Sequence, residues 1–117
     1  MKKKLLSLLS IAAMSIAFGQ WTPQNTGVQS QVIIQNIAVK DAKTVWTTFG
    51  DASGQSVYPR YVAVTGDGGT TWKNKIATGV PSTALISDIY GKDANTAFIV
   101  TAPTGSAGAA NGLWKTT

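Results

Sequence analysis

The sequence repeats itself with a period of 52 residues. When Thr26 is aligned with Thr78, the register holds without a gap as far as Thr48, and 10 of the 23 aligned residues are identical. The identities include the tripeptides Thr-Gly-Val and Lys-Asp-Ala, and Trp46 is aligned with Phe98. A fixed period of this length is typical of repeat folds, in which each unit buries its apolar surface against the next unit. We therefore expect one supersecondary unit to be used twice.

Each unit has the pattern of four short strands. Residues 32–39 form an apolar run in which Ile33, Ile34 and Ile37 are expected to be largely buried, and a polar turn follows at 40–43. The next strands are expected at residues 44–49, 58–65 and 71–76, since β-branched and aromatic residues lie between Gly- and Ser-containing loops.

Four antiparallel strands in about 50 residues match one blade of a β-propeller. The predicted fold is all-β, a propeller of four-stranded antiparallel blades of which about two are present. The alternative is a β-sandwich with a fortuitous duplication.

The repeat also divides the chain. Residues 20–30 are predicted to form an N-terminal strand and linker, residues 31–80 the first propeller repeat, and residues 81–117 a truncated second repeat. Propellers usually need four to eight blades to close. We therefore expect this sequence to be the N-terminal piece of a longer protein.

Residues 1–19 have the three parts of a secretory signal peptide. Three lysines at positions 2–4 precede an uncharged apolar run over 5–18, and Ala17-Phe18-Gly19 supplies small residues for cleavage before Gln20. The alternative is a membrane anchor, but the apolar run is shorter than the roughly 20 residues needed to span a bilayer. We therefore predict an exported protein, secreted or displayed on the cell surface, with the export machinery as a partner.

Charge and composition narrow the function. Three of the ten basic residues lie in the leader, so the remaining chain carries seven basic and five acidic residues, a net charge of +2 without a basic stripe. We expect no nucleic-acid partner. Histidine, cysteine and glutamate are absent, which excludes a Ser-His-Asp set or a Cys/His metal site within this sequence. No metal and no cofactor are expected.

One motif extends from Thr65 to Trp72, reading Thr-Gly-Asp-Gly-Gly-Thr-Thr-Trp. Its glycines can adopt the positive φ angles of a tight hairpin. The carboxylate of Asp67 can accept hydrogen bonds from backbone N–H groups of its own turn. The Trp72 indole has a large apolar face and one N–H that needs a partner.

This motif resembles the Asp-box, or BNR repeat, of sialidases, sortilin-type receptors and xyloglucanase-type glycosidases. The resemblance extends to 112–117, which look like the strand leading into a second box, and implies a sialidase-like propeller fold. It also implies that the box residues Thr65, Asp67, Gly69, Thr71 and Trp72 are structural rather than catalytic. The layout is similar to that of proteins exported by the type IX secretion route, which implies secretion by, or display on, a Gram-negative bacterium.

The five carboxylates are the candidate catalytic groups. Asp41 and Asp93 are equivalent in the repeat, which favours a structural role, and Asp67 belongs to the box. Asp51 lies in a loop, and Asp88 replaces Asn36 on a first strand, where propellers usually bind ligands. Asp88 is the one weak binding candidate, with a hydrogen bond to a neighbouring blade as its alternative role. No catalytic residue is assigned.

Two functions remain open. The first is a non-catalytic binding or scaffold module for a carbohydrate or protein ligand. The second is an Asp-box glycoside hydrolase, sialidase-like or endoglucanase-like, with its catalytic residues downstream. A sialidase needs three arginines and a Tyr/Glu pair, whereas the sequence beyond the leader has only Arg60 and no glutamate. The oligomeric state is left open.

Overall fold

The computed structural model describes residues 21–28, 30–105 and 111–116. The predicted signal peptide lies outside the described residues. Within these residues, no helix is long and apolar enough to cross a membrane. The described chain is all-β, with two antiparallel sheets and no helix, so the predicted fold class is confirmed at this level.

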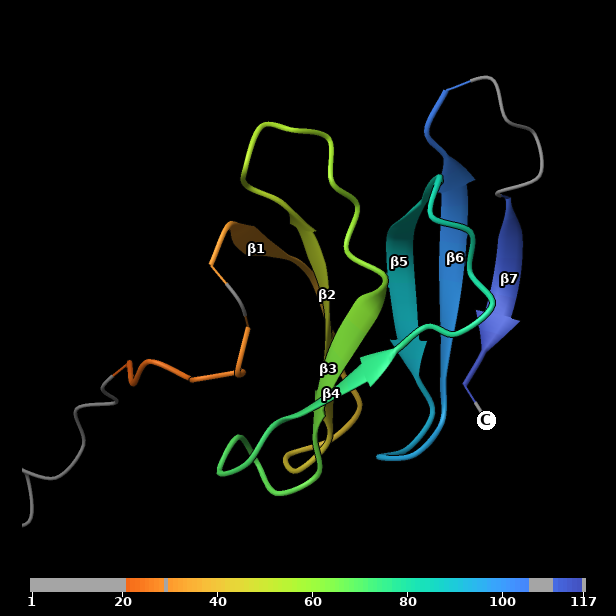
Figure 1. The fold of residues 1–117 in the computed structure, drawn as a ribbon. Helices are drawn as coiled ribbons and strands as arrows, with labels where there is room; N and C mark the ends of the chain where they lie inside the picture. Colours follow the sequence, from red (N-terminus) through yellow and green to blue (C-terminus); the bar gives the residue numbers. More distant parts are fainter. Residues whose placement is uncertain (1–20, 29, 106–110, 117) are drawn as a thin grey trace, which may run out of the picture.

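The first sheet has four strands that follow the chain order β1-β2-β3-β4. The second sheet has three strands in the order β5-β6-β7 (Figure 1). Their bounds are β1 Val32–Val39, β2 Val45–Asp51, β3 Tyr61–Thr65, β4 Lys73–Ile76, β5 Ala84–Gly91, β6 Ala97–Pro103 and β7 Gly112–Lys115.

The two sheets repeat one another in register. Val32 pairs with Asp51 in the first sheet, and 52 residues later Ala84 pairs with Pro103. A register shift between Ile34 and Asn36 recurs between Ile86 and Asp88. The two halves of the chain therefore share their strand pairing as well as their residues.

The turns that join the first two strands of each sheet are repeated too. In the first, Asp41 Oδ1 accepts hydrogen bonds from the backbone N–H groups of Lys43 and Thr44, each 2.8 Å long. In the second, Asp93 accepts from Asn95 at 2.8 Å and from Thr96 at 2.7 Å. These bonds depress the pKa of both carboxyls. The repeated aspartates therefore have the structural role expected of them.

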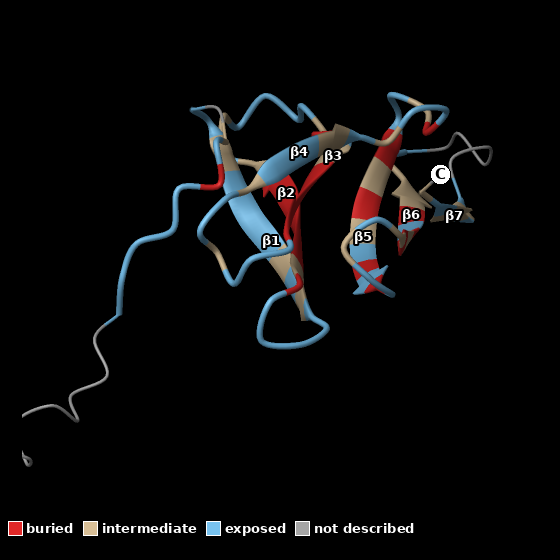
Figure 2. Cartoon of the chain, turned by 90° about the horizontal axis from the view of Figure 1, so that it is seen from below, coloured by how far each residue is buried: buried red, intermediate tan, exposed pale blue. Residues whose placement is uncertain are grey.

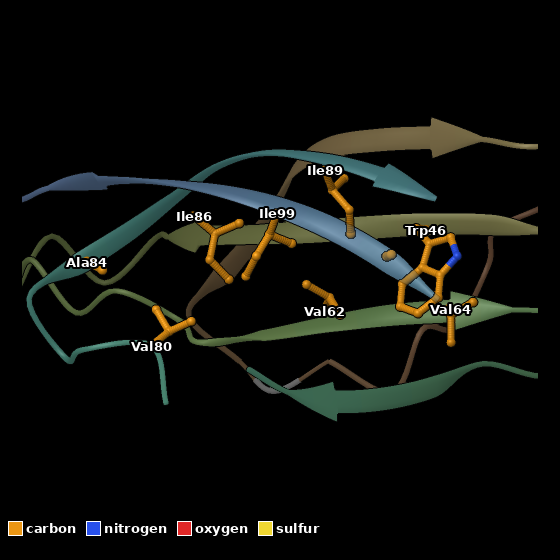
Figure 3. Packing of buried hydrophobic residues seen from close by; sticks show 9 residues of the cluster. Trp46, Val62, Val64, Val80, Ala84, Ile86, Ile89 and Ile99 are labelled. Carbon is orange, nitrogen blue, oxygen red and sulfur yellow. The ribbon is translucent and has the colours of Figure 1, made fainter. Parts of the chain in front are cut away.

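The core lies between the two sheets. Figure 3 shows Trp46 and Val62 of the first sheet lying close to Ile86, Ile89 and Ile99 of the second. These side chains are at most 6% exposed and form one apolar cluster. Burial of a side chain of this size contributes roughly 1.5–3 kcal/mol. The first sheet is thus stabilised by stacking on the second.

Trp46 makes the most specific contact across this interface. Its indole Nε1 donates a 2.8 Å hydrogen bond to the carbonyl oxygen of Asp93, and its ring lies against Gly91. Lys75 sits 5.5 Å from the ring centre and donates a 3.3 Å bond to the carbonyl of Asn95. One aromatic side chain and one lysine of the first sheet therefore hold the β5–β6 turn of the second.

The isoleucines of β1 are not buried as predicted. Ile33 and Ile34 are each 54% exposed and Ile37 is 66% exposed, and Figure 2 shows much of β1 in the exposed colour. The equivalent residues of β5, Ile86 and Ile89, are buried because the first sheet covers that face. The described chain has no sheet on the corresponding face of β1, and this explains the difference.

Three strands begin later than predicted: β2 by one residue, at Val45, and β3 and β4 by more, for local reasons. β3 starts at Tyr61 rather than at residue 58, because Pro59 has no backbone N–H to donate to a sheet. β4 starts at Lys73 rather than at residue 71, because the N–H of Thr71 donates to the Asp67 carboxylate. The described residues 21–28 contain no strand, and residues 20 and 29 lie outside the described part of the chain, so the strand expected within 20–30 stays a prediction.

Candidate functional site

The Asp67 carboxylate organises the turn between β3 and β4. Its Oδ1 accepts hydrogen bonds of 2.8 Å from both the Thr65 hydroxyl and the Thr71 backbone N–H. Its Oδ2 accepts a 2.6 Å bond from the Thr71 hydroxyl. The Thr65 oxygen in turn accepts from the N–H of Gly69 at 2.9 Å. Four box residues are thus brought together, and the donors to the carboxylate all belong to the box itself.

Backbone geometry and charge agree with this role. Gly68 and Gly69 have φ angles of 71° and 93°, which side chains rarely tolerate. Hydrogen bonds lower the pKa of Asp67 to about 2, and the largest contributions come from the Thr71 hydroxyl and the Thr71 backbone N–H. A general acid needs the opposite shift, towards a raised pKa. The arrangement therefore suits a permanently ionised carboxylate that closes a turn.

Trp72, the last box residue, lies half-buried just before β4. Its indole Nε1 is buried without a hydrogen-bond partner among the described residues. A buried unpaired N–H costs roughly 1–3 kcal/mol. The partner expected for this group is therefore not supplied by the described chain.

Asp51 is also committed to its own loop. Its Oδ1 accepts from the Ser53 hydroxyl at 2.5 Å and from the Ser53 N–H at 2.8 Å, and its Oδ2 accepts from the Val57 N–H at 3.2 Å. These bonds, led by the Ser53 hydroxyl, lower the pKa of Asp51. Together with Asp41, Asp67 and Asp93, it makes four carboxylates that serve as acceptors within their own turns.

Asp88 differs from these four carboxylates. It is exposed at the register shift of β5, and the bond found for its side chain is a 2.8 Å bond from the adjacent N–H of Ile89. No bond from Asp88 to the other sheet is found among the described residues. Its alternative role, a hydrogen bond to a neighbouring sheet, is instead performed by its equivalent in the first repeat.

That equivalent is Asn36. Its Nδ2 donates a 2.9 Å bond to the carbonyl oxygen of Ser87 on β5 and a 3.1 Å bond to the Thr48 hydroxyl. Asn36 therefore joins β1 to β5 at the register shift of each strand. Sequence reasoning did not select it, although its alignment with Asp88 was the signal that could have done so.

The two register shifts place four polar residues on neighbouring strands. We call Gln35, Asn36, Ser87 and Asp88 the bulge strip. Bulges re-aim side chains and are over-represented next to active sites. Gln35 is exposed beside Gly50, and Asp88 retains acceptor capacity on its carboxylate. The strip therefore offers amide and carboxylate groups to a polar ligand.

A second polar region lies at the junction between the sheets. A groove of about 400 Å³ is lined by Asp67 and Thr71 of the box, by Lys73 and Lys75, and by Asn95 of the second sheet. Asp67 and Lys75 already have the partners described above. In the bulge strip the Asn36 amide and the Ser87 hydroxyl are likewise bonded, the hydroxyl to the carbonyl oxygen of Val100 at 3.1 Å. Arg60 lies elsewhere, and its guanidinium donates a 3.0 Å bond to the carbonyl of Val80.

In the described ranges, no three acidic, histidine or cysteine side chains gather where they could hold a metal ion. Comparison of the chain with protein-family models, with curated proteins and with solved structures finds no match. The bulge strip is thus selected on geometry alone.

Proposed function

We propose that the chain is part of a secreted or cell-surface β-propeller and serves as a non-catalytic binding or scaffold module, with the bulge strip facing a carbohydrate or protein ligand. The two sheets would be consecutive blades, with an Asp-box at the β3–β4 turn. Residues 1–19 would direct export.

The observation that carries the binding role is the paired register shift of β1 and β5. Asn36 fixes the two strands to each other, which gives the strip a rigid base. The repeat changes asparagine to aspartate at this point, so the two blades present different groups in equivalent places. Polar side chains held on rigid strands are suited to recognise hydroxyl or amide groups.

A non-catalytic role is supported by the states of the carboxylates. Four of the five have lowered pKa values and accept hydrogen bonds within their own turns. Glycoside hydrolysis generally needs a pair of carboxyl groups, one of which keeps its proton. Asp88 alone does not supply such a pair.

The test uses the 117-residue chain on a glycan array that contains sialosides and β-glucans. We expect retention of at least one glycan class, and an affinity that falls about tenfold in Asp88→Ala through loss of a charge-assisted hydrogen bond. Gln55→Ala is the matched control, because Gln55 is exposed in a loop outside the strip.

Equal binding by Asp88→Ala and the unchanged chain would contradict the bulge strip as the ligand site. Fluorogenic sialosides and β-glucans test the alternative activity. Hydrolysis that is lost in Asp88→Asn would replace the binding proposal with a glycosidase.

A further inference from the structure

The fold gathers most of the basic residues at one end of the two sheets. The β1–β2, β3–β4 and β5–β6 turns all lie at this end, in the lower part of Figure 1. Six of the seven basic residues beyond the predicted leader lie in these turns or on the strands next to them. We call these six the basic end: Lys40, Lys43, Lys73, Lys75, Lys92 and Lys115. The sequence shows no basic stripe because the six are spread over three turns and two strands.

Contacts between the turns make the basic end one continuous surface. The backbone N–H of Gly68 in the β3–β4 turn donates a 2.9 Å bond to the carbonyl oxygen of Lys43 in the β1–β2 turn. A Cβ added at Gly66 would lie 3.3 Å from the Cβ of Ala94, so the β3–β4 turn also touches the β5–β6 turn. The lysines of the two sheets therefore face solvent side by side.

The basic end carries a net positive charge. Its six lysines share the turns with three aspartates, Asp41, Asp67 and Asp93. The charged residues elsewhere in the described chain are Arg60, Asp51 and Asp88, which together are negative. Five of the six lysines are exposed, and no ion pair is found for any of them among the described residues. This end of the molecule therefore attracts anions, whereas the rest of the described chain does not.

A groove in the basic end can seat one anionic group. It has a volume of about 400 Å³, and Lys73 and Lys75 both line it. Lys75 is held in place by its 3.3 Å bond to the Asn95 carbonyl and by the Trp46 ring. Lys73 is exposed, and no bond is found for its ammonium group within the described residues. Asp67 also lines the groove, but its oxygens already accept three bonds from the box.

The turn aspartates add acceptors between these donors. Asp41 and Asp93 are exposed, and each accepts its two backbone bonds through Oδ1 alone. A carboxylate has about four acceptor positions, so each retains acceptor capacity. The basic end thus presents ammonium donors next to carboxylate acceptors. A uronic acid polymer complements both, since it carries carboxylates and hydroxyl donors, whereas the phosphates of duplex DNA carry no donor.

We propose that the basic end binds an acidic polysaccharide made of uronic acids, with one ligand carboxylate seated in the groove between Lys73 and Lys75. Hydroxyl groups of the same polymer donate to the turn aspartates. This surface is separate from the bulge strip, which lies at the register shifts of β1 and β5. The proposal therefore goes beyond the proposed function, because it gives the chain a second ligand surface of different chemistry.

Binding to polygalacturonate tests the proposal. Every chain carries Lys2→Gln, Lys3→Gln and Lys4→Gln, because these lysines of the predicted leader would bind a polyanion by themselves. We expect Lys73→Gln to weaken binding about three- to fivefold, as the loss of an exposed ion pair implies. Arg60→Gln is the matched control, because it removes the same charge beyond the opposite end of β3, and its affinity should change less than about twofold.

Two further variants separate binding from folding. Lys73→Arg keeps the charge and should bind as the unchanged chain does, and Lys92→Gln should weaken binding from the second sheet. Melting temperatures followed by circular dichroism check that each variant is folded. Equal losses in Lys73→Gln and Arg60→Gln would overturn the proposal, since net charge rather than the basic end would then govern binding.

Salt and competing polymers give the second readout. Raising NaCl from about 0.1 M to about 1 M shortens the Debye length from about 10 Å to about 3 Å, so the affinity should fall at least about tenfold. Neutral dextran should not compete. Competition by dextran, or tighter binding of duplex DNA than of polygalacturonate at the same salt, would contradict a site for acidic sugars. Because Asp88 lies outside the basic end, either result leaves the bulge strip to its own test.

Discussion

A methyl group added at Gly91 would probe the packing between the two sheets. The new Cβ in Gly91→Ala would lie 2.9 Å from Nε1 of Trp46 and closer still to Cδ1. Gly91 is not among the residues with positive φ, so its backbone can accept alanine and the effect is steric. Trp46 is fully buried and cannot move aside freely. Overpacking costs about 1–3 kcal/mol, and strain on the bond to the Asp93 carbonyl adds up to about 1 kcal/mol.

Urea unfolding followed by far-UV circular dichroism measures this cost. We expect Gly91→Ala to lose about 2 kcal/mol in the free energy of unfolding. Trp46→Phe alone should lose about 1–2 kcal/mol, because it removes the indole hydrogen bond and leaves a small cavity. In the double variant the smaller ring makes room for the methyl group, so its loss should be at least about 1 kcal/mol less than the sum of the single losses. Strict additivity would refute the reasoning that these two residues meet between the sheets.

Three other perturbations test the turns and the link between β1 and β5. The pKa of Asp67 in the folded chain lies below its value of 3.8 in the unfolded chain, so the stability that its carboxylate contributes is present above pH 3.8 and is lost as the pH falls towards about 2. Melting temperatures measured against pH should show this loss, and the Asp67→Asn chain should not show it. Asn36→Ala should lower the free energy of unfolding in urea by about 1–2 kcal/mol, because it breaks the hydrogen bond to the second sheet. Gln35→Ala, at an exposed neighbouring position, should change it by no more than about 0.5 kcal/mol, and equal losses in the two variants would contradict the role of Asn36. Gly68→Ala should lower the melting temperature more than Gly54→Ala, because both have φ near +70° but only at Gly68 would the added Cβ lie 3.2 Å from a backbone atom, the carbonyl oxygen of Ala42; the reverse order would contradict this packing.

The sequence was informative about local structure. The first strand was predicted at the residues where β1 is found, because an apolar β-branched run ends at a polar turn. The positive φ angles of Gly68 and Gly69 followed from the turn chemistry. The start of β4 was predicted two residues early, since composition does not reveal that the Thr71 N–H bonds to a carboxylate.

Burial was harder to predict because it depends on the neighbouring sheet. Ile34 and Ile86 have the same residue type and strand position, yet one is exposed and the other buried. No pattern within a single unit separates them. The bond from Asn36 to Ser87 was missed for a related reason, since it joins residues 51 positions apart that meet only when the units stack.

Among the candidate residues, repetition was the most useful guide. The equivalence of Asp41 and Asp93 predicted a structural role, and both accept two backbone bonds in matching turns. Asp88 was set apart because it breaks the repeat, and it is the carboxylate with the fewest partners found. Sequence reasoning could not foresee the bulge strip, because the register shifts that create it arise from strand pairing.

The most direct test of the stacked arrangement is a nuclear Overhauser spectrum of the chain in solution. The account predicts cross-peaks between the indole N–H of Trp46 and the α-protons of Gly91, together with cross-strand peaks within each sheet. Cross-strand peaks without any contact between Trp46 and Gly91 would contradict it, because the two sheets would then fold without stacking on each other.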